Sequence, residues 1–279
     1  MQVAPKDRTS VQVQGRINYL GEMAVRPRFY AVDYSRDNLV IRGEPLPIRD
    51  ARFVDPPPSL DREGFTLVPH SSAVSEFRDM DSVQRVYLPE IERLMLEVTG
   101  AARILMTPGA VLRFGERSKE FGSRVNTRPA RFTHVDYTPQ SAPGLLNPLL
   151  KAAGVELRPG QRYAGYNIWR ALSEPPQDVP LAVCDAQTVA PGDLVTGDAV
   201  FDAPNQPEWG FEAYLVRHNP AHRWSYFSNM TRDEALIFKA YDTDPGQPVR
   251  VPHVAFDDPG CPAGVTPRAS VEVRCFALY

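Results

Sequence analysis

The sequence lacks any run of about 18 consecutive apolar residues, so it offers no candidate for a membrane-spanning helix. Its first residues, MQVAPKDRTS, contain no apolar stretch of the kind found in a signal peptide. It also lacks a surplus of positive charge, because 31 Lys and Arg residues stand against 34 Asp and Glu residues, a formal net charge of −3. These absences argue against a membrane partner and against a nucleic-acid partner.

Cysteine is scarce as well. Cys184, Cys261 and Cys275 are an odd number, and no two of them have C-x-x-C spacing. Neither a disulfide framework nor a structural zinc site is predicted. We therefore expect a reducing, cytoplasmic location.

Proline, by contrast, is abundant, with 28 residues spread along the chain. Proline interrupts helices and central strands, so the regular elements should be short. Helical spacing of apolar residues predicts helices over 84–100, ending at Gly100, and within 143–157. Strand-like runs with turns between them follow, which is typical of a double-sheet jelly roll. These runs are RYAGYNIWRAL, PLAVCDAQTV, EWGFEAYLVRH, RWSYFSNM, EALIFKAYDT, VPHVAFDD and SVEVRCFALY.

The fold class is therefore expected to be mainly β (α+β), a cupin-like jelly roll with flanking helices. We expect residues 1–279 to form one catalytic domain. Within it, residues 1–125 would be a strand-rich N-terminal extension with a supporting helix, and residues 126–279 would be the jelly-roll core.

The segment RFTHVDYTP carries the chemistry. On a strand, His134 and Asp136 point to the same face, so an imidazole and a carboxylate can meet one metal ion. His253, in RVPHVAFDDP, is the candidate for a third ligand. Two histidines and one carboxylate form the facial triad of non-haem iron(II) oxygenases, which leaves coordination positions open. An isolated H-x-D match more often reflects a structural histidine paired with an aspartate.

An R-x-S motif follows the third candidate ligand. Arg268 and Ser270 share a strand face, and an arginine fork with a hydroxyl can hold the far carboxylate of a dicarboxylate co-substrate. Arg274 lies on the same face by period-2 counting and competes with Arg268 for this role. Asn126 and Asn167 are further candidates for donating to a co-substrate or substrate.

Other histidines are weaker candidates. His218 and His222 are four residues apart, but Pro220 breaks the helix that would bring them to one metal, so we expect structural or substrate-side roles. His70 has no candidate partner nearby and is expected at the surface.

Several ordered segments resemble one family of oxygenases. They are RFTHVDYTP, YNIWRAL with PLAVCDAQTV, RHNPAHRWSYFSNMTRDEALIFKAYDT, and PHVAFDDP with RASVEVR. The family is that of the cephamycin-pathway hydroxylase component and of the fungal gibberellin-desaturase-like and aspergillic-acid-type hydroxylase/desaturase proteins.

The resemblance implies a distorted double-stranded β-helix that uses Fe(II), 2-oxoglutarate and O2 to hydroxylate, desaturate or cyclise a small molecule, often in secondary metabolism. It implies metal-ligand roles for His134, Asp136 and His253, and co-substrate binding for Arg268 and Ser270. It also makes a companion enzyme a candidate partner; a homodimer is the other candidate, and the sequence does not decide between them. Two alternatives stay open: a cupin-type metalloenzyme that does not use 2-oxoglutarate, and a catalytically silent partner subunit.

Overall fold

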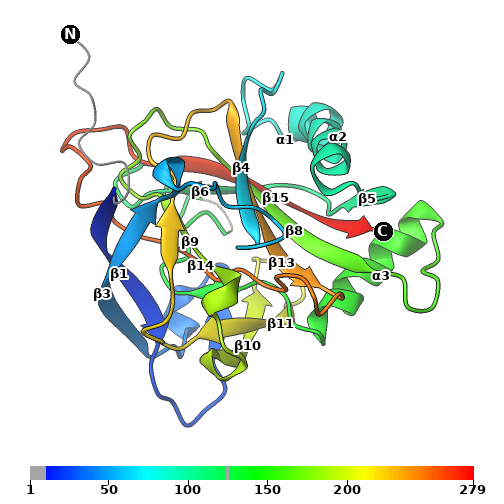
Figure 1. Cartoon of the computed structure of the whole chain (residues 1–279), viewed down its shortest axis with the longest axis horizontal. Helices are drawn as coiled ribbons and strands as arrows, with labels where there is room; N and C mark the ends of the chain where they lie inside the picture. The colour runs from blue at the N-terminus through cyan, green and yellow to red at the C-terminus, as the bar shows by residue number, and fades with distance from the viewer. Residues whose placement is uncertain (1–10, 124–125) are drawn as a thin grey trace.

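Two β-sheets dominate the structure (Figure 1), a computed structural model that describes residues 11–123 and 126–279. The nine-stranded sheet has the order β1 (Gln12–Leu20), β3 (Ile41–Asp50), β12 (Trp224–Tyr226), β9 (Leu181–Cys184), β14 (His253–Ala255), β7 (His134–Val135), β11 (Trp209–Val216), β10 (Leu194–Phe201) and β2 (Arg28–Tyr30). The six-stranded sheet has the order β4 (Phe65–Pro69), β13 (Glu234–Asp242), β8 (Tyr163–Ala171), β15 (Ala269–Leu278) and β5 (Arg103–Met106), and β6 (Val111–Phe114) pairs with β15.

Period-2 alternation along β8 and β15 gives the six-stranded sheet two different faces. On β8, Ile168 belongs to a cluster with the helical segment, whereas Trp169 packs toward the nine-stranded sheet in a cluster that includes Val183. On β15, Val271, Val273, Cys275 and Ala277 face the helical side. The alternate positions of these two strands therefore face the space between the sheets, where polar residues can form a site.

The helices cover the outer face of the six-stranded sheet or lie beside it. They are α1 (Met80–Ser82), a π-helical turn (Val83–Tyr87), α2 (Leu88–Thr99) and α3 (Ser141–Ala153). The buried side of α2 packs on β15 and β5, and burying each large apolar side chain stabilises the fold by roughly 1.5–3 kcal/mol. Gly100 ends α2 with φ 64°, a left-handed conformation that glycine adopts without strain. No helix in the described part of the chain is both long enough and apolar enough to cross a membrane.

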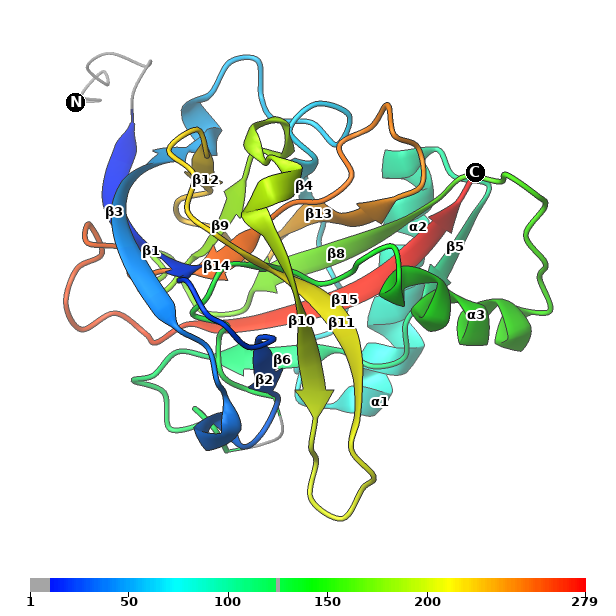
Figure 2. The same cartoon turned by 90° about the horizontal axis from the view of Figure 1, so that it is seen from below.

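The sequence-based expectation of a mainly β, two-sheet jelly roll with flanking helices is confirmed. All seven expected strand segments contain strands, from β8 to β15, and the two expected helices are present as α2 and α3. Among residues 126–279 the expected strands did not include β10 (Leu194–Phe201), which pairs with β11 to form a long hairpin that projects from the body of the molecule in Figure 2. Strands from the first 125 residues join both sheets, because β3 pairs with β12 and β4 pairs with β13.

Candidate metal centre and adjoining cavities

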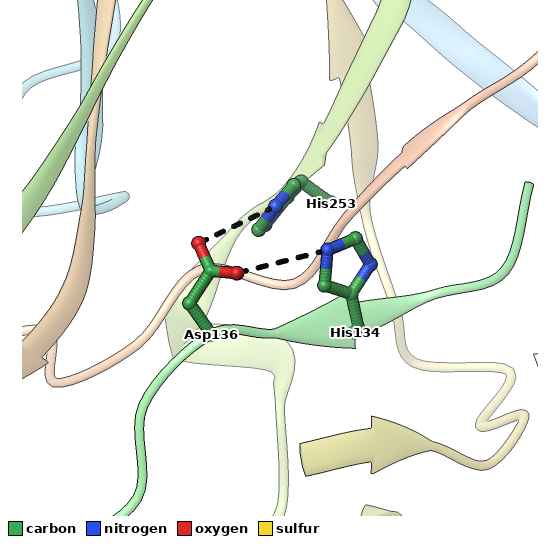
Figure 3. A group of neighbouring side chains, drawn as sticks. All are labelled: His134, Asp136 and His253. Carbon is green, nitrogen blue, oxygen red and sulfur yellow. Dashed lines mark ion pairs between the residues drawn. The ribbon is translucent and has the colours of Figure 1, made fainter. Parts of the chain in front are cut away.

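Two neighbouring strands bring His134, Asp136 and His253 together. His134 on β7 lies directly opposite His253 on β14 in the antiparallel pair, and Asp136 follows β7 two residues after His134. The Nε2 atoms of His134 and His253 lie 3.9 and 4.0 Å from the two carboxylate oxygens of Asp136. Figure 3 shows the carboxylate directed toward both rings. One ligand atom from each residue lies within 4.8 Å of the others, close enough for one metal ion to contact all three.

Backbone carbonyls orient both imidazole rings. Nδ1 of His134 lies 3.0 Å from the carbonyl oxygen of Phe132, and Nδ1 of His253 lies 3.2 Å from that of Val251. A carbonyl can only accept, so each Nδ1 carries the proton and donates it. Each Nε2 then presents its lone pair to the centre of the group, as a metal-binding histidine requires.

The protonation states also suit a metal. Burial lowers the pKa of His134 to about 3, with a smaller contribution from His253, and burial likewise lowers the pKa of His253. Burial by itself would raise the pKa of Asp136, but the charge of Arg274 and smaller contributions that include the hydrogen bond from Asn167 outweigh it and hold that pKa well below its usual range. The group thus offers two neutral imidazoles and one charged carboxylate at neutral pH.

Two residues of the opposite sheet hold the Asp136 carboxylate. Asn167 on β8 donates a hydrogen bond from Nδ2 to Oδ2 of Asp136. Arg274 on β15 lies 3.4 Å from both carboxylate oxygens, through Nη2 to Oδ1 and through Nε to Oδ2. The same guanidinium lies 2.5 Å from Oε1 of Glu272. Arg274 is therefore matched by two carboxylates, and its pKa is raised.

Arg268, which immediately precedes β15, has a different environment from that of Arg274. Its side chain is 1% exposed, and its side-chain hydrogen bonds go to Ser270 Oγ at 3.2 Å and to the carbonyl of Val179 at 3.0 Å. The guanidinium lies over the Trp169 ring, 5.2 Å from its centroid. Burial, followed by two nearby arginines, lowers the pKa of Arg268 to about 9. Among the described residues no carboxylate accepts a hydrogen bond from this side chain, so a buried cation lacks a counter-ion.

Two cavities adjoin the three clustered side chains. The first, here termed the inner cavity, has a volume of about 10 Å³, and its lining extends from the histidines to Arg268 between the sheets, so the side chains around it would have to move apart to admit a ligand larger than water. Its wall includes His134, His253, Trp169, Arg268, Glu272 and Arg274. Trp169 Nε1 is buried and has no hydrogen-bond partner in the described structure, so the inner cavity contains both an unmatched cation and an unused donor.

The second cavity, here termed the aromatic cavity, has a volume of about 260 Å³ and also reaches His134 and Asp136. Its apolar wall includes Phe29, Tyr34, Phe121, Phe132, Phe201 and Phe211. Phe29 and Phe132 make an edge-to-face contact with centroids 4.9 Å apart, and Phe201 and Phe211 stack at 5.7 Å. Such a concave, ring-lined space is typical of a small-molecule site.

The remaining histidines lie away from the three clustered residues. His222 is buried between the Tyr19 hydroxyl and the Asp193 carboxylate, each 3.1 Å from a ring nitrogen, which is a structural role as expected. The expectation for His70 was wrong. It is half-buried, and its Nδ1 lies within hydrogen-bond distance of Arg170 Nη2, because β4 and β13 bring residues distant in sequence together.

Sequence reasoning missed Arg113 and Arg128, which line the aromatic cavity. For Arg128 a signal was present, since residues 116–133 are rich in basic side chains, but only the fold shows which of them face inward; Arg113 lies before this segment, in β6. Asn126 accepts a hydrogen bond from Arg113 at 3.0 Å, so it positions that arginine.

Comparison with known proteins gives consistent matches over most of the chain. Residues 17–278 match the model of the oxidoreductase/YMDC permease-like domain. The chain is 32% identical over 255 residues to the hydroxylase/desaturase efuI of Hormonema carpetanum, covering 85% of this chain and 84% of that protein. It is 31% identical to the Fe(II)/2-oxoglutarate-dependent dioxygenase nvfI of Aspergillus novofumigatus, covering 78% and 77%. A solved structure of the iron and alpha-ketoglutarate-dependent endoperoxidase NvfI has the same fold, with a TM-score of 0.76 at 23% identity over 97% of this chain and 98% of that one.

Proposed function

This chain belongs to the Fe(II)/2-oxoglutarate-dependent oxygenase family of its fungal hydroxylase/desaturase relatives, and from that membership we propose that His134, Asp136 and His253 hold Fe(II). The chain is an oxidoreductase that acts on a small molecule in secondary metabolism. The observation that carries the metal proposal is the convergence of two neutral imidazoles and one charged carboxylate within 4.8 Å. This donor set fits Fe(II), because it is the combination that facial-triad oxygenases use.

For the co-substrate, we assign the far carboxylate of 2-oxoglutarate to Arg268 and Ser270. The inner cavity joins the histidines to Arg268, and a dianion there would give this buried guanidinium the counter-ion that the protein does not provide. Arginine binds carboxylates well because its planar fork can donate two parallel hydrogen bonds. Trp169 Nε1, buried and unused, is a further donor to the same ligand.

Arg274 and Asn167 receive a different role in this proposal. Both contact Asp136, and Arg274 is already matched by Asp136 and Glu272. We therefore assign them to positioning the ligand carboxylate rather than to binding 2-oxoglutarate. Groups that orient metal ligands commonly change metal affinity when they are removed.

Bound Fe(II) and 2-oxoglutarate would activate O2, which is the oxidant; 2-oxoglutarate and the substrate would each give up two electrons. In hydroxylation, R–H, O2 and 2-oxoglutarate give R–OH, succinate and CO2; in desaturation, two hydrogens leave the substrate and one water forms in addition. The protein's own residues hold the carboxylate ligand charged, keep both imidazoles neutral and surround the reaction with a mostly apolar wall. Such an enclosed site restricts side reactions with water.

The test is an anaerobic titration of the metal-free protein with Fe(II) and 2-oxoglutarate. We expect a weak visible charge-transfer band, followed by succinate release when O2 is admitted. A band without succinate would indicate the silent partner subunit, and iron binding with no spectral response to 2-oxoglutarate would indicate the cupin-type alternative.

We further propose that residues 1–279 act as one catalytic domain, since strands from residues 1–125 complete both sheets around the 126–279 core. The three cysteines are free, which supports a cytoplasmic location. Light scattering on the purified chain tests the candidate homodimer, and co-purification with products of neighbouring genes tests a companion enzyme.

A further inference from the structure

The aromatic cavity contains two guanidinium groups, those of Arg113 and Arg128, that have no carboxylate partner within residues 11–123 and 126–279. Arg128 lies with its guanidinium carbon 4.4 Å from the Tyr34 ring centroid and 5.0 Å from that of Phe121. Its Nε is buried and has no hydrogen-bond partner in the described structure. Contact with aromatic faces stabilises a cation but leaves its charge and the N–H edge of the guanidinium available.

Arg113 lines the aromatic cavity and the inner cavity. Its Nη1 donates to Asn126 Oδ1 at 3.0 Å and to the carbonyl of Arg128 at 2.5 Å, so it fixes the backbone that carries Arg128. Burial lowers the pKa of Arg113, as expected for a cation without a matching anion in contact. Arg113 thus positions Arg128 and adds a second positive charge beside it.

Arg131 and Glu116, two further charged groups of this cavity, match each other, whereas Asp37 has no ion-pair partner among the described residues. Arg131 donates to both oxygens of Glu116, at 2.7 and 2.8 Å, and to Asp257. Asp37 accepts the backbone N–H of Tyr30 at 2.8 Å, and burial raises its pKa to about 6.

The proposed iron site has no surplus negative charge that could neutralise the guanidinium groups of the aromatic cavity. Asp136, Glu272, Arg274 and Arg268 have equal numbers of positive and negative charges, and Fe(II) would be neutralised by dianionic 2-oxoglutarate. Among the described residues, Arg113 and Arg128 have no carboxylate partner, and Asp37 is the one unmatched carboxylate of this lining. The aromatic cavity therefore has a surplus of one positive charge when Asp37 is ionised.

On the basis of the proposed function, we propose that the substrate is a small carboxylic acid with an apolar, ring-containing skeleton, and that Arg128 binds its carboxylate. The skeleton packs against rings such as Phe132 and Phe211, in the cavity that also reaches the metal ligands His134 and Asp136. A carboxylate at Arg128 would use the N–H edge that no protein group occupies. The C–H bond to be oxidised then lies at the end of the substrate away from its carboxylate.

The test compares planar acids with their uncharged amides, for example 2-naphthoic acid with 2-naphthamide and 4-phenylbenzoic acid with its amide. Anaerobic protein loaded with Fe(II) and saturating 2-oxoglutarate is titrated in a calorimeter, so that the inner cavity is filled before each probe is added. We expect at least one acid to bind about tenfold more tightly than its amide, because hydrogen bonds to charged groups are stronger than neutral ones.

Variants of Arg128 test whether this residue causes the tighter binding of the acid. Arg128→Gln should reduce the preference for the acid to about twofold or less while amide binding stays, and Arg128→Lys should give an intermediate preference because it keeps the charge but not the fork. Arg158→Gln is the matched control, since Arg158 is exposed and lies outside the lining of both cavities. If Arg128→Gln does not fold, the acid preference of Arg128→Lys is compared with that of the wild type instead. A weaker preference in Arg128→Lys supports the role of Arg128, and an unchanged preference contradicts it.

Equal affinity of every acid and its amide would overturn the proposal, as would an acid preference that persists in Arg128→Gln. The charge-transfer band separates this inference from the proposed function. A missing band in the wild-type protein would count against the iron and 2-oxoglutarate assignment itself, whereas a normal band with equal acid and amide binding would count against the substrate class alone.

Discussion

His253 lies directly opposite His134 across the β7–β14 pair, with ring centroids 4.2 Å apart, although the two residues are far apart in the sequence. The pairing of these two short strands therefore creates the geometry of the proposed metal site. Each ring is fixed by a backbone carbonyl two residues before it, so the strands determine both the position and the tautomer of the two histidines.

Replacing one of these histidines should remove iron without unfolding the protein. His253→Ala is expected to lower succinate formation at least about 100-fold, because a metal centre that loses one of its three protein ligands binds iron much more weakly. His218→Ala is the control, since His218 is exposed and contacts Tyr19 rather than the clustered residues. Circular dichroism should be unchanged in both variants, and retained succinate formation in His253→Ala would contradict the ligand assignment.

The two arginines on the β15 face should differ in their effect on 2-oxoglutarate. Arg268→Gln is expected to raise the KM for 2-oxoglutarate roughly 10- to 100-fold, because hydrogen bonds to charged groups contribute about 1.5–3 kcal/mol. Arg274→Gln should change that KM much less, since its charge is matched by Asp136 and Glu272. Steady-state kinetics with varied 2-oxoglutarate measure both, and the reverse pattern would mean that Arg274 is the anchor.

Asn167 should affect iron affinity more than protein stability. Asn167→Ala removes the hydrogen bond to Asp136, and loss of such a ligand partner typically weakens metal binding about 10- to 100-fold. The thermal midpoint should fall little, because Asn167 Oδ1 is buried without a partner and its removal offsets part of the lost bond. Competition for Fe(II) with a chromogenic chelator gives the affinity, and an unchanged value would show that Asn167 does not orient the ligand.

A buried ion pair away from the site should make stability depend on pH. Lys239 and Asp242 are both fully buried, with Nζ 3.0 Å from the carboxylate, and Arg162 contacts the same carboxylate at 2.8 Å. Burial would raise the pKa of Asp242, but Arg162 and Lys239 outweigh it, so the folded-state pKa lies below the usual value. Asp242→Asn should destabilise the protein by about 3 kcal/mol at pH 7, because it leaves a buried ammonium unmatched.

The sign of the pH effect follows from this depressed pKa. The contribution of Asp242 is complete above its unfolded-state pKa of about 4, and it is lost as the pH falls through the lower folded-state value. The stability difference between wild type and Asp242→Asn should therefore be constant from pH 7 to 5 and shrink in more acidic solution. Asp233→Asn, at an exposed position, is the control. A difference that grows on acidification would contradict the assignment.

The sequence predicted the strands that carry the site because their apolar and β-branched residues favour strands over helices or loops. It also predicted that His134 and Asp136 share a face, since period-2 geometry is local. It missed β10, whose run LVTGDAVF has Gly197 and no regular alternation and is stabilised by pairing with β11.

The choice between Arg268 and Arg274 could not be made from the sequence, because both lie on the same strand face. Only tertiary contacts distinguish them: Arg274 meets Asp136 and Glu272, whereas Arg268 meets a hydroxyl, a carbonyl and an aromatic ring. The role of Arg128 could not be predicted from the sequence for a related reason. It lies in an irregular segment, where no periodicity predicts which side chains face a cavity.

Crystals grown without oxygen in the presence of Fe(II) and 2-oxoglutarate give the most direct measurement, through anomalous diffraction at the iron edge. We predict a single strong peak within bonding distance of His134 Nε2, His253 Nε2 and an Asp136 oxygen, with density for a dicarboxylate reaching Arg268. An iron peak elsewhere, or none between these three side chains in a well-ordered crystal, would contradict the account.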